Sequence, residues 1–328
     1  MPERIRWGIL GTGAIARKFA AALRALPGAY LAAIGSRTRS KAAQFGEQFA
    51  IPERHASYEA LLNDPAVDAV YVATPHSCHE DNALAALAAN KPVLVEKPFT
   101  INARGAEAVI RAARGKGLLV MEAMWTRFIP LHTQLRQMLA SGVIGHVRSL
   151  RADFGFMAGP QANPRLFDPA LGGGALLDIG VYPVSLASMI FGKPSQITGR
   201  AKIGPAGVDE QSEMLLNYPR GRHAALSCSL LANTSNEALI EGAAGRIRIH
   251  PPFFMSDAMT LARDGHTEEL LRFPFEGNGY QFEAIEFMNC LRARKTESQI
   301  MPLEETLGIM KTLDALRAQW GVRYPMEP

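Results

Sequence analysis

The chain begins with a short apolar run, residues 5–10, that leads directly into the sequence GTGAIA at residues 11–16. Apolar residues then recur at helical spacing as far as Leu26. A strand, a glycine turn and a helix in this order form a G-x-G-x-x-G/A pattern, in which the helix N-terminus binds a pyrophosphate. We therefore expect a dinucleotide-binding fold here, contacted by the residues of the turn and the helix start: Gly11, Thr12, Gly13, Ala14 and Ile15.

Strand-like and helix-like segments alternate through residues 1–123. Apolar β-type runs at 30–34, 67–73, 93–95 and 118–121 are separated by helical patterns at 40–49, 58–62, 79–90 and 102–116. This alternation is typical of a doubly wound parallel sheet of the α/β class, for which we expect six strands. Since ligands bind at the carboxyl edge of such a sheet, the residues that follow each strand are candidate site residues.

The second strand ends in Ser36-Arg37-Thr38-Arg39. An NAD site usually has an acidic residue about twenty residues after the glycines, where it binds the ribose hydroxyls. This chain has a hydroxyl and two guanidinium groups there, and a guanidinium can bind a phosphate through two parallel hydrogen bonds. Ser36 and Arg37 therefore favour NADP over NAD; solvated loop charges are the alternative interpretation.

The strand at 67–73 ends in a loop that contains two histidines and a cysteine, residues 74–79. The spacing of His76, Cys78 and His79 matches no zinc pattern, so we expect no metal site. We expect the loop to line the nicotinamide side of the cofactor cleft, through Thr74, Pro75, His76 and His79.

The strand at 93–95 ends abruptly in Glu96-Lys97-Pro98. A buried parallel strand delivers charged groups to the carboxyl edge of its sheet in this way. Proline restricts the residue before it, so Lys97 is presented from a rigid corner, for which a cis bond is one option. A solvated Glu-Lys pair at an ordinary strand end is the alternative.

Taken together, these motifs resemble those of the Gfo/Idh/MocA oxidoreductases. The resemblance covers nearly the whole chain and extends to EAMWTRF at 122–128 and GGGALLDIGVY at 172–182. It is nearest to the branch of dimeric dihydrodiol dehydrogenases and NADP-dependent D-xylose dehydrogenases. It implies a Rossmann domain at 1–123, an α+β substrate-binding and oligomerisation domain with a large, mostly antiparallel open sheet at 124–300, and a C-terminal helix at 301–328 that packs back on the nucleotide domain.

The resemblance also implies roles for individual residues. Lys97 matches the catalytic lysine of the Glu-Lys-Pro motif, and Asp178 and Tyr182 match its companions. Many members of the family have histidine at the position of Tyr182, so inositol-type members are poorer models for this chain. Trp125 and Arg127 are expected to close over the nicotinamide and to shape the substrate pocket.

The second half of the sequence is rich in strands. Alternation from His146 and strand patterns from 196 to 273 predict a large antiparallel sheet with few helices to cover it. Its uncovered face would then be buried against another subunit, which predicts a homodimer or a higher homo-oligomer. Phe154 is core or pocket wall, and Tyr280, at the start of a helix to Arg294, is expected to point its hydroxyl into the cleft.

Composition limits the remaining classes of function. The 328 residues carry a net charge of +4 from scattered basic residues, which predicts no nucleic-acid or membrane partner. The three cysteines, Cys78, Cys228 and Cys290, are far apart and odd in number, and no apolar run follows the N-terminus. A cytoplasmic protein is the resulting expectation.

These observations favour an NADP-dependent dehydrogenase or reductase, with NAD as the alternative cofactor. It would act on a hydroxyl or carbonyl group of a sugar, an anhydrosugar or a cyclic diol. We assign proton transfer to Tyr182, with Lys97 lowering its pKa and Asp178 positioning Lys97; proton transfer by Lys97 itself is the alternative. A catalytically silent nucleotide-binding sensor and an NAD-retaining hydrolase of the same fold are the competing functions.

Overall fold

The computed structural model describes residues 4–161 and 163–327. The chain divides into two compact units. The first comprises the residues up to Phe128 together with Glu276–Leu307, and the second comprises Ile129–Phe275 together with the residues from Gly308 onward.

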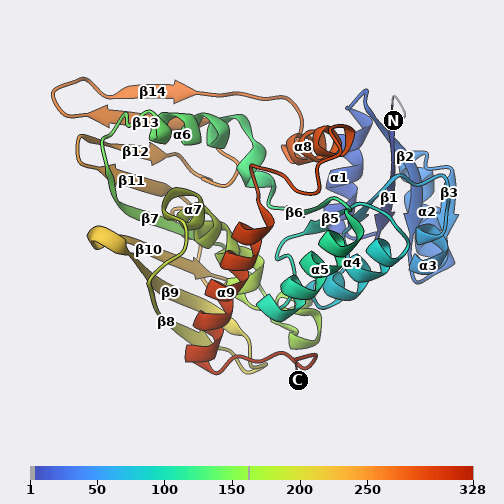
Figure 1. Cartoon of the computed structure of the whole chain (residues 1–328). Coiled ribbons are helices and arrows are strands. Elements are labelled where there is room, and N and C mark those ends of the chain that lie inside the picture. Colours follow the sequence, from blue (N-terminus) through green and yellow to red (C-terminus); the bar gives the residue numbers. More distant parts are fainter. Residues whose placement is uncertain (1–3, 162, 328) are drawn as a thin grey trace. The chain divides into compact units, whose positions relative to one another are not determined.

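The first unit is built on a parallel sheet of six strands, which confirms the expected doubly wound class. The strand order is β3-β2-β1-β4-β5-β6, so the topology reverses between β1 and β4 (Figure 1). Register places Val72 opposite Val95 and Glu96 opposite Ala123, so these strands end at one edge. The strands are β1 (Ile5–Leu10), β2 (Ala29–Gly35), β3 (Glu53–His55), β4 (Ala69–Val72), β5 (Val93–Glu96) and β6 (Val120–Ala123).

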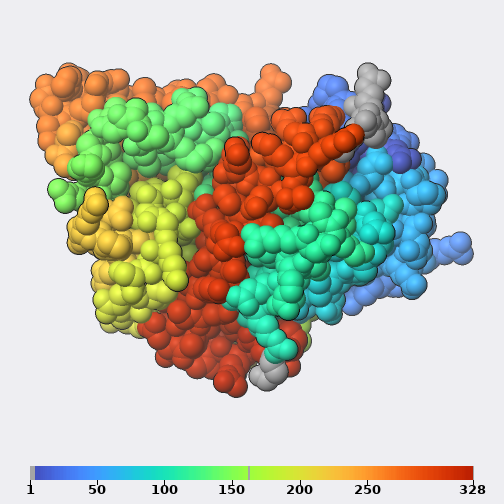
Figure 2. Space-filling model, in the orientation of Figure 1, coloured from blue at the N-terminus to red at the C-terminus, as the bar shows by residue number. Residues whose placement is uncertain are grey.

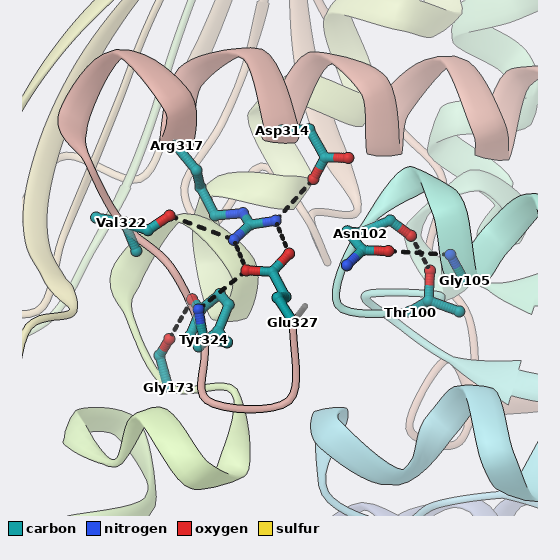
Figure 3. Close-up of polar contacts among 9 residues, drawn as sticks. All are labelled: Thr100, Asn102, Gly105, Gly173, Asp314, Arg317, Val322, Tyr324 and Glu327. Carbon is teal, nitrogen blue, oxygen red and sulfur yellow. Dashed lines mark hydrogen bonds and ion pairs between the residues drawn. The ribbon is translucent and has the colours of Figure 1, made fainter.

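Two helices of this unit, α3 and α5, start at residues whose side chains cap the first turn. Asn102 accepts a hydrogen bond from the amide of Gly105 (Figure 3), and Ser57 accepts one from the amide of Ala60. Gly117, with φ +63°, ends the helix that Asn102 caps. The helices are α1 (Ala14–Arg24), α2 (Arg39–Phe49), α3 (Tyr58–Leu62), α4 (His79–Ala88), α5 (Ala103–Lys116) and α8 (Tyr280–Arg292).

An aromatic cluster forms part of the core of the first unit. The Phe19 ring from α1 stacks on the Tyr71 ring from β4 with centroids 3.7 Å apart. Trp7 from β1 lies 5.1 Å from Phe287 of α8 and meets Phe19 edge to face. All four rings are fully buried, and such contacts add to the stabilisation that comes from burying their area. Helix α8 therefore completes this core although it is distant in sequence.

The second unit contains an eight-stranded sheet in the order β14-β13-β12-β11-β7-β10-β9-β8. All neighbours are antiparallel except β7 and β10, which confirms the expected large and mostly antiparallel sheet. Both expected hairpins, at 218–221 and 262–265, are present as β9–β10 and β13–β14. The strands are β7 (Val147–Gly155), β8 (Gln196–Ile203), β9 (Asp209–Tyr218), β10 (Arg222–Ser229), β11 (Ala238–Gly242), β12 (Gly245–Ile249), β13 (Ala258–Arg263) and β14 (Glu269–Arg272).

Helices cover one face of this sheet. They are α6 (Pro130–Ala140), α7 (Val181–Phe191) and the second half of α9 (Leu303–Trp320) (Figure 1), and α6 and α9 are visible at the surface in green and red (Figure 2). Along β9, Met214 and Leu216 are buried while Leu215 between them is 42% exposed. The other face carries Leu215 and a series of ion pairs: Arg151–Glu241, Arg200–Glu213 and Arg248–Glu237.

The expected boundaries at 123/124 and 300/301 differ from those of the two units. Helix α8, which was expected in the substrate domain, belongs to the first unit because Phe287 packs on Trp7. Residues 308–328, which were expected to pack on the nucleotide domain, belong to the second unit, where Gln319 bonds to Gly199 and Ile197 of β8. An amphipathic pattern does not indicate which sheet a helix will cover.

One helical stretch, Pro169–Phe191, is long and apolar enough to cross a membrane by composition. Most of its apolar window is buried within the protein, and the core helix of a soluble protein has the same composition. Within this stretch, Leu176–Gly180 is a π-helix that continues into α7. Single π turns of this kind are frequent at functional sites.

Candidate active site

The glycine loop after β1 is shaped by one close approach. Gly11 has φ +103°, and a Cβ there would lie 2.6 Å from the carbonyl oxygen of Ala73, at the end of β4. Gly13 is the N-cap of α1, where no side chain caps the helix, and a Cβ there would meet nothing within 4 Å. The amides at the start of α1 are thus available to an anion, as the sequence predicts for residues Gly11 to Ile15.

The residues after β2 form the candidate 2′-phosphate site. Ser36 is buried and its amide bonds to the carbonyl of His55, which fixes the loop against β3. Arg37 is exposed, as is Arg39 at the start of α2. Burial raises the pKa of the Tyr58 phenol, and the positive charge of Arg37 opposes this rise. Arg37 therefore offers a guanidinium at the edge where the sequence predicts a phosphate.

The loop after β4 is held by buried polar contacts. His79 is fully buried, with Nδ1 2.8 Å from the carbonyl oxygen of Pro98 and Nε2 2.9 Å from that of Thr74. Asn82 also donates to the hydroxyl of Thr74. His76 meets the His79 ring edge to face, with centroids 5.6 Å apart. His79 thus ties the loop after β4 to the loop after β5.

At the end of β5, Glu96 and Lys97 point into different environments. Glu96 is buried and accepts hydrogen bonds from the hydroxyl of Tyr71 and from the amide of Lys97. Lys97 is partly exposed, and the Lys97–Pro98 peptide bond is cis. The strand end therefore anchors the carboxylate and presents the ammonium.

A second buried acid, Glu283 of α8, was not singled out by the sequence. Its side chain is fully buried, and neither carboxylate oxygen has a hydrogen-bond partner among the described residues. The pKa of Glu283 is raised well above the ordinary value, mainly by burial and secondly by the charge of Glu96. We therefore take Glu283 to be neutral. An acid in the first turn of a helix normally indicates a surface position, so the sequence carried no signal for this residue.

The segment after β6 is also buried. Trp125 stacks on Tyr280 with ring centroids 4.6 Å apart, so two residues expected at the pocket lie together in the first unit. Arg127 is 2% exposed and its Nη2 lies 2.6 Å from Glu305. Burial raises the pKa of Glu122 to about 7, although the hydroxyl of Thr306 and the charge of Arg127 oppose the rise. In this structure the buried guanidinium of Arg127 is paired with a partly exposed carboxylate.

In the second unit, Asp178 and Tyr182 lie on consecutive turns at the start of the long helix. Arg165 donates to Asp178 Oδ1 at 2.9 Å, and Asp178 is largely buried. Arg165 was not identified from the sequence because its loop shows no pattern that relates it to Asp178. The pair keeps one oxygen of the carboxylate bound to a cation.

Tyr182 lies against an aromatic cluster. Phe154 and Phe254 stack with ring centroids 4.0 Å apart, and the Tyr182 ring lies 5.5 Å and 5.6 Å from them. Both phenylalanines are partly exposed, so neither belongs to the fully buried core. Phe254 was not predicted, because it follows Pro251-Pro252 in a loop without periodicity.

The chain matches two family models that together cover most of its length. Residues 5–124 match the model described as "Oxidoreductase family, NAD-binding Rossmann fold", and residues 132–248 match the GFO/IDH/MocA C-terminal domain. Among curated proteins, the chain is 37% identical over 335 residues to a trans-1,2-dihydrobenzene-1,2-diol dehydrogenase of Mus musculus, covering 98% of this chain and 99% of that one. The corresponding protein of Homo sapiens is 36% identical over 332 residues, with the same coverage.

Solved structures of other enzymes are similar over nearly the whole chain. A 3-ketoreductase from Actinomadura kijaniata, in complex with NADP and TDP-benzene, is 31% identical with a TM-score of 0.86, covering 96% of this chain and 97% of that one. An aldose-aldose oxidoreductase from Caulobacter crescentus is 26% identical with a TM-score of 0.87, covering 95% and 96%. With both domain models matched in order, the chain belongs to the Gfo/Idh/MocA family of oxidoreductases.

Proposed function

We propose that this chain is an NADP-dependent dehydrogenase or reductase acting on a hydroxyl or carbonyl group of a sugar, an anhydrosugar or a cyclic diol. The observation that carries the proposal is the presence of Lys97, Asp178 and Tyr182 in ordered surroundings, each at a position that the family motif defines. A nucleotide-binding sensor has no need of a proton donor, so these three residues argue against a silent homologue.

The proposed chemistry divides hydride and proton between cofactor and protein. When bound, NADP accepts the hydride from an alcohol carbon or NADPH supplies it to a carbonyl carbon. Tyr182 exchanges the proton with the substrate oxygen, and a phenol with a pKa near 10 needs a nearby positive charge to act as a base at neutral pH. We assign that charge to Lys97, with Asp178 as the residue that orients the lysine.

The cofactor preference rests on Ser36 and Arg37. The end of β2 has an exposed guanidinium and a buried hydroxyl where an NAD site has an acid. The similar 3-ketoreductase was solved with NADP. We propose NADP as the preferred cofactor, held also by the glycine loop and by the loop at 74–79, with Glu96, Trp125 and Arg127 of the same unit supporting the nicotinamide side.

The proposed substrate class rests on the aromatic rings that lie near Tyr182. Phe154 and Phe254 place two rings beside Tyr182, the proposed proton donor. Aromatic faces bind the apolar C–H face of a sugar ring or the ring of a cyclic diol. The names of the relatives, a diol dehydrogenase and an aldose oxidoreductase, support this class.

We also propose a homodimer formed through the open face of the eight-stranded sheet. A shallow depression of about 620 Å³ on this face is lined by strands β7 to β11 and includes the exposed Leu215. The paired arginines and glutamates around it would meet their own counterparts in a two-fold interface. All three cysteines are free thiols, which supports a reducing, cytoplasmic location.

One experiment tests the proposed function and the roles of two residues. NADP-linked oxidation of aldoses, anhydrosugars and trans-dihydrodiols would be measured for the wild type, Tyr182→Phe and Lys97→Met. We expect Tyr182→Phe to lower kcat by roughly 10² to 10⁴ and to abolish the rise in oxidation rate at alkaline pH, while NADP still binds. Near-normal kcat in Tyr182→Phe with an inactive Lys97→Met would assign the proton to the lysine. A wild type that binds NADP but oxidises none of these substrates would favour the sensor.

A further inference from the structure

The last residues of the chain return to the loop that begins the helix of Asp178 and Tyr182. Tyr324 is 2% exposed, and its hydroxyl donates a hydrogen bond to the carbonyl oxygen of Gly173 at 2.6 Å (Figure 3). Position 173 requires glycine, because a Cβ there would lie 2.7 Å from the carbonyl oxygen of Leu166. A residue close to the C-terminus is therefore bonded to the start of the proposed catalytic helix.

The tail that carries Tyr324 is anchored by a buried arginine of α9. Arg317 donates from Nη1 and Nη2 to the two carboxylate oxygens of Glu327, at 2.7 and 2.8 Å, and from Nη2 to Asp314 at 2.8 Å (Figure 3). The Glu327 carboxylate also accepts from the amide of Tyr324 at 2.9 Å, and the guanidinium lies 5.0 Å from the Tyr324 ring centroid. Bidentate, charge-assisted contacts of this kind fix orientation as well as position. The Tyr324 phenol is thus held rigidly.

The same loop is held from another direction by Asp209 of β9. This fully buried carboxylate accepts the amide of Leu176 at Oδ2, 2.7 Å away, which caps the first turn of the helix. Its Oδ1 has no hydrogen-bond partner in the described part of the chain, and a Cβ on Gly174 would lie 2.5 Å from it. The same Cβ would lie 3.3 Å from the hydroxyl of Tyr324. Gly174, with φ +110°, therefore passes between the two side chains.

Movement of this loop would be transmitted directly to the proposed catalytic residues. The amide of Asp178 bonds to the carbonyl of Gly174 at 3.2 Å, and the π turn that follows sets the direction in which Asp178 and Tyr182 project. A displacement of about 1 Å at a reacting group can lower a rate by about 10²-fold. The contacts that hold the first turn in place should therefore affect the reaction rate as well as the stability of the fold.

We propose that Asp314, Arg317, Tyr324 and Glu327 form a C-terminal clasp whose function is to position the helix of Asp178 and Tyr182. The clasp residues are positioning residues, because they act through Gly173 and not on the substrate. This inference rests on the proposed roles of Asp178 and Tyr182. It assigns a part in catalysis to the last turn of α9 and to a tail that the sequence had only indicated as a packing element.

The test compares two single-hydroxyl deletions in the same unit. Tyr324→Phe removes the bond to Gly173. Tyr218→Phe is the matched control, because Tyr218 is also buried but its hydroxyl has no hydrogen-bond partner among the described residues. Glu327→Gln, which keeps an acceptor oxygen for Arg317 but removes the charge, is a second, milder variant. We would measure kcat, KM, NADPH affinity, Tm and amide hydrogen exchange in 174–182 for each protein.

We expect Tyr324→Phe to lower kcat by about 10- to 100-fold, with KM and NADPH affinity changed less than about threefold, and to speed exchange in 174–182. Glu327→Gln should show the same changes to a smaller degree, and Tyr218→Phe should show neither. If Tyr324→Phe lowers Tm but keeps both kcat and the exchange of 174–182 at wild-type values, the clasp only anchors the tail and the proposal is wrong. If the wild type has no activity, the proposed function fails, and the exchange comparison of the two variants still decides whether the clasp holds the helix.

Discussion

The carboxylate of Asp209 lies 2.7 Å from the backbone amide of Leu176 and caps the first turn of a helix while being wholly enclosed by protein. Burial raises the pKa of this group to about 6, although the bonded amide opposes the rise. The other titratable or charged groups that act on it are Arg317, Tyr324 and Cys228. An acid that caps a helix and is half protonated near pH 6 links the stability of this helix to pH.

The first prediction concerns that linkage. A folded-state pKa above the unfolded value means that Asp209 stabilises the fold below about pH 4 and that this contribution is lost as the pH rises through about 6. Asp209→Asn keeps an oxygen for Leu176 but does not titrate. Between pH 4 and pH 7 its free energy of unfolding should therefore fall by about 2 to 3 kcal/mol less than that of the wild type. Urea unfolding at both pH values measures this difference. Asp264→Asn, at an exposed turn, is the control, and equal pH slopes in wild type and Asp209→Asn would contradict the prediction.

The second prediction concerns the 2′-phosphate. Removing a guanidinium that binds a phosphate costs about 1.5 to 3 kcal/mol, so Arg37→Ala should weaken NADP binding by roughly 10- to 100-fold and leave NAD binding nearly unchanged. Titration calorimetry with both cofactors measures the two affinities. Lys41→Ala, another exposed cation nearby on α2, should change neither. Equal losses for NADP and NAD in Arg37→Ala would show that the residue does not bind the phosphate.

The third prediction separates the two glycines of the cofactor loop. Gly11→Ala places a Cβ 2.6 Å from a backbone carbonyl at positive φ, so it should destabilise the fold by roughly 1 to 3 kcal/mol. Gly13→Ala meets no protein atom within 4 Å, so it should leave Tm nearly unchanged and yet weaken NADP binding, since the methyl group fills space that the pyrophosphate needs. Thermal melts with and without NADP distinguish the two effects. A Gly13→Ala protein with normal cofactor affinity would place the pyrophosphate elsewhere.

The fourth prediction concerns the open sheet face. Leu215→Asp puts a charge into the depression proposed as the dimer interface, so it should convert a dimer into a monomer at micromolar concentration. Leu270→Asp is the matched control, because Leu270 is 54% exposed on β14 and does not line the depression. Light scattering gives the masses. A wild type that is already monomeric, or a Leu215→Asp protein that stays dimeric, would show that this face is not the interface.

Local patterns predicted the elements of this protein better than their long-range partners. The fingerprint at Gly11, five of the six parallel strands and the hairpin at 218–221 follow from periodicity and turn chemistry within a few residues of each other. Contacts between residues that are far apart in the sequence have no such local pattern and were not predicted. Phe254 stacks on Phe154 across a hundred residues, and Tyr324 reaches Gly173 across 151. Side chains of this kind can be placed only when the sheet order is known.

The assignment of α8 failed for the same reason. Its sequence has a helical pattern, but nothing in it indicates that Phe287 would face Trp7 rather than pack on the antiparallel sheet of the second unit. Glu283 was missed with it, because a buried acid without a partner cannot be told from a surface acid by its neighbours in sequence.

The dependence of the first unit on α8 also determines when that unit can finish folding on the ribosome. Its six strands and five of its helices are synthesised first, but the indole of Trp7 has no Phe287 to pack against until the polypeptide has been extended past residue 287. By then the whole eight-stranded sheet has emerged. The surface of α1 and Trp7 that α8 covers therefore stays exposed in the nascent unit until α8 has been synthesised.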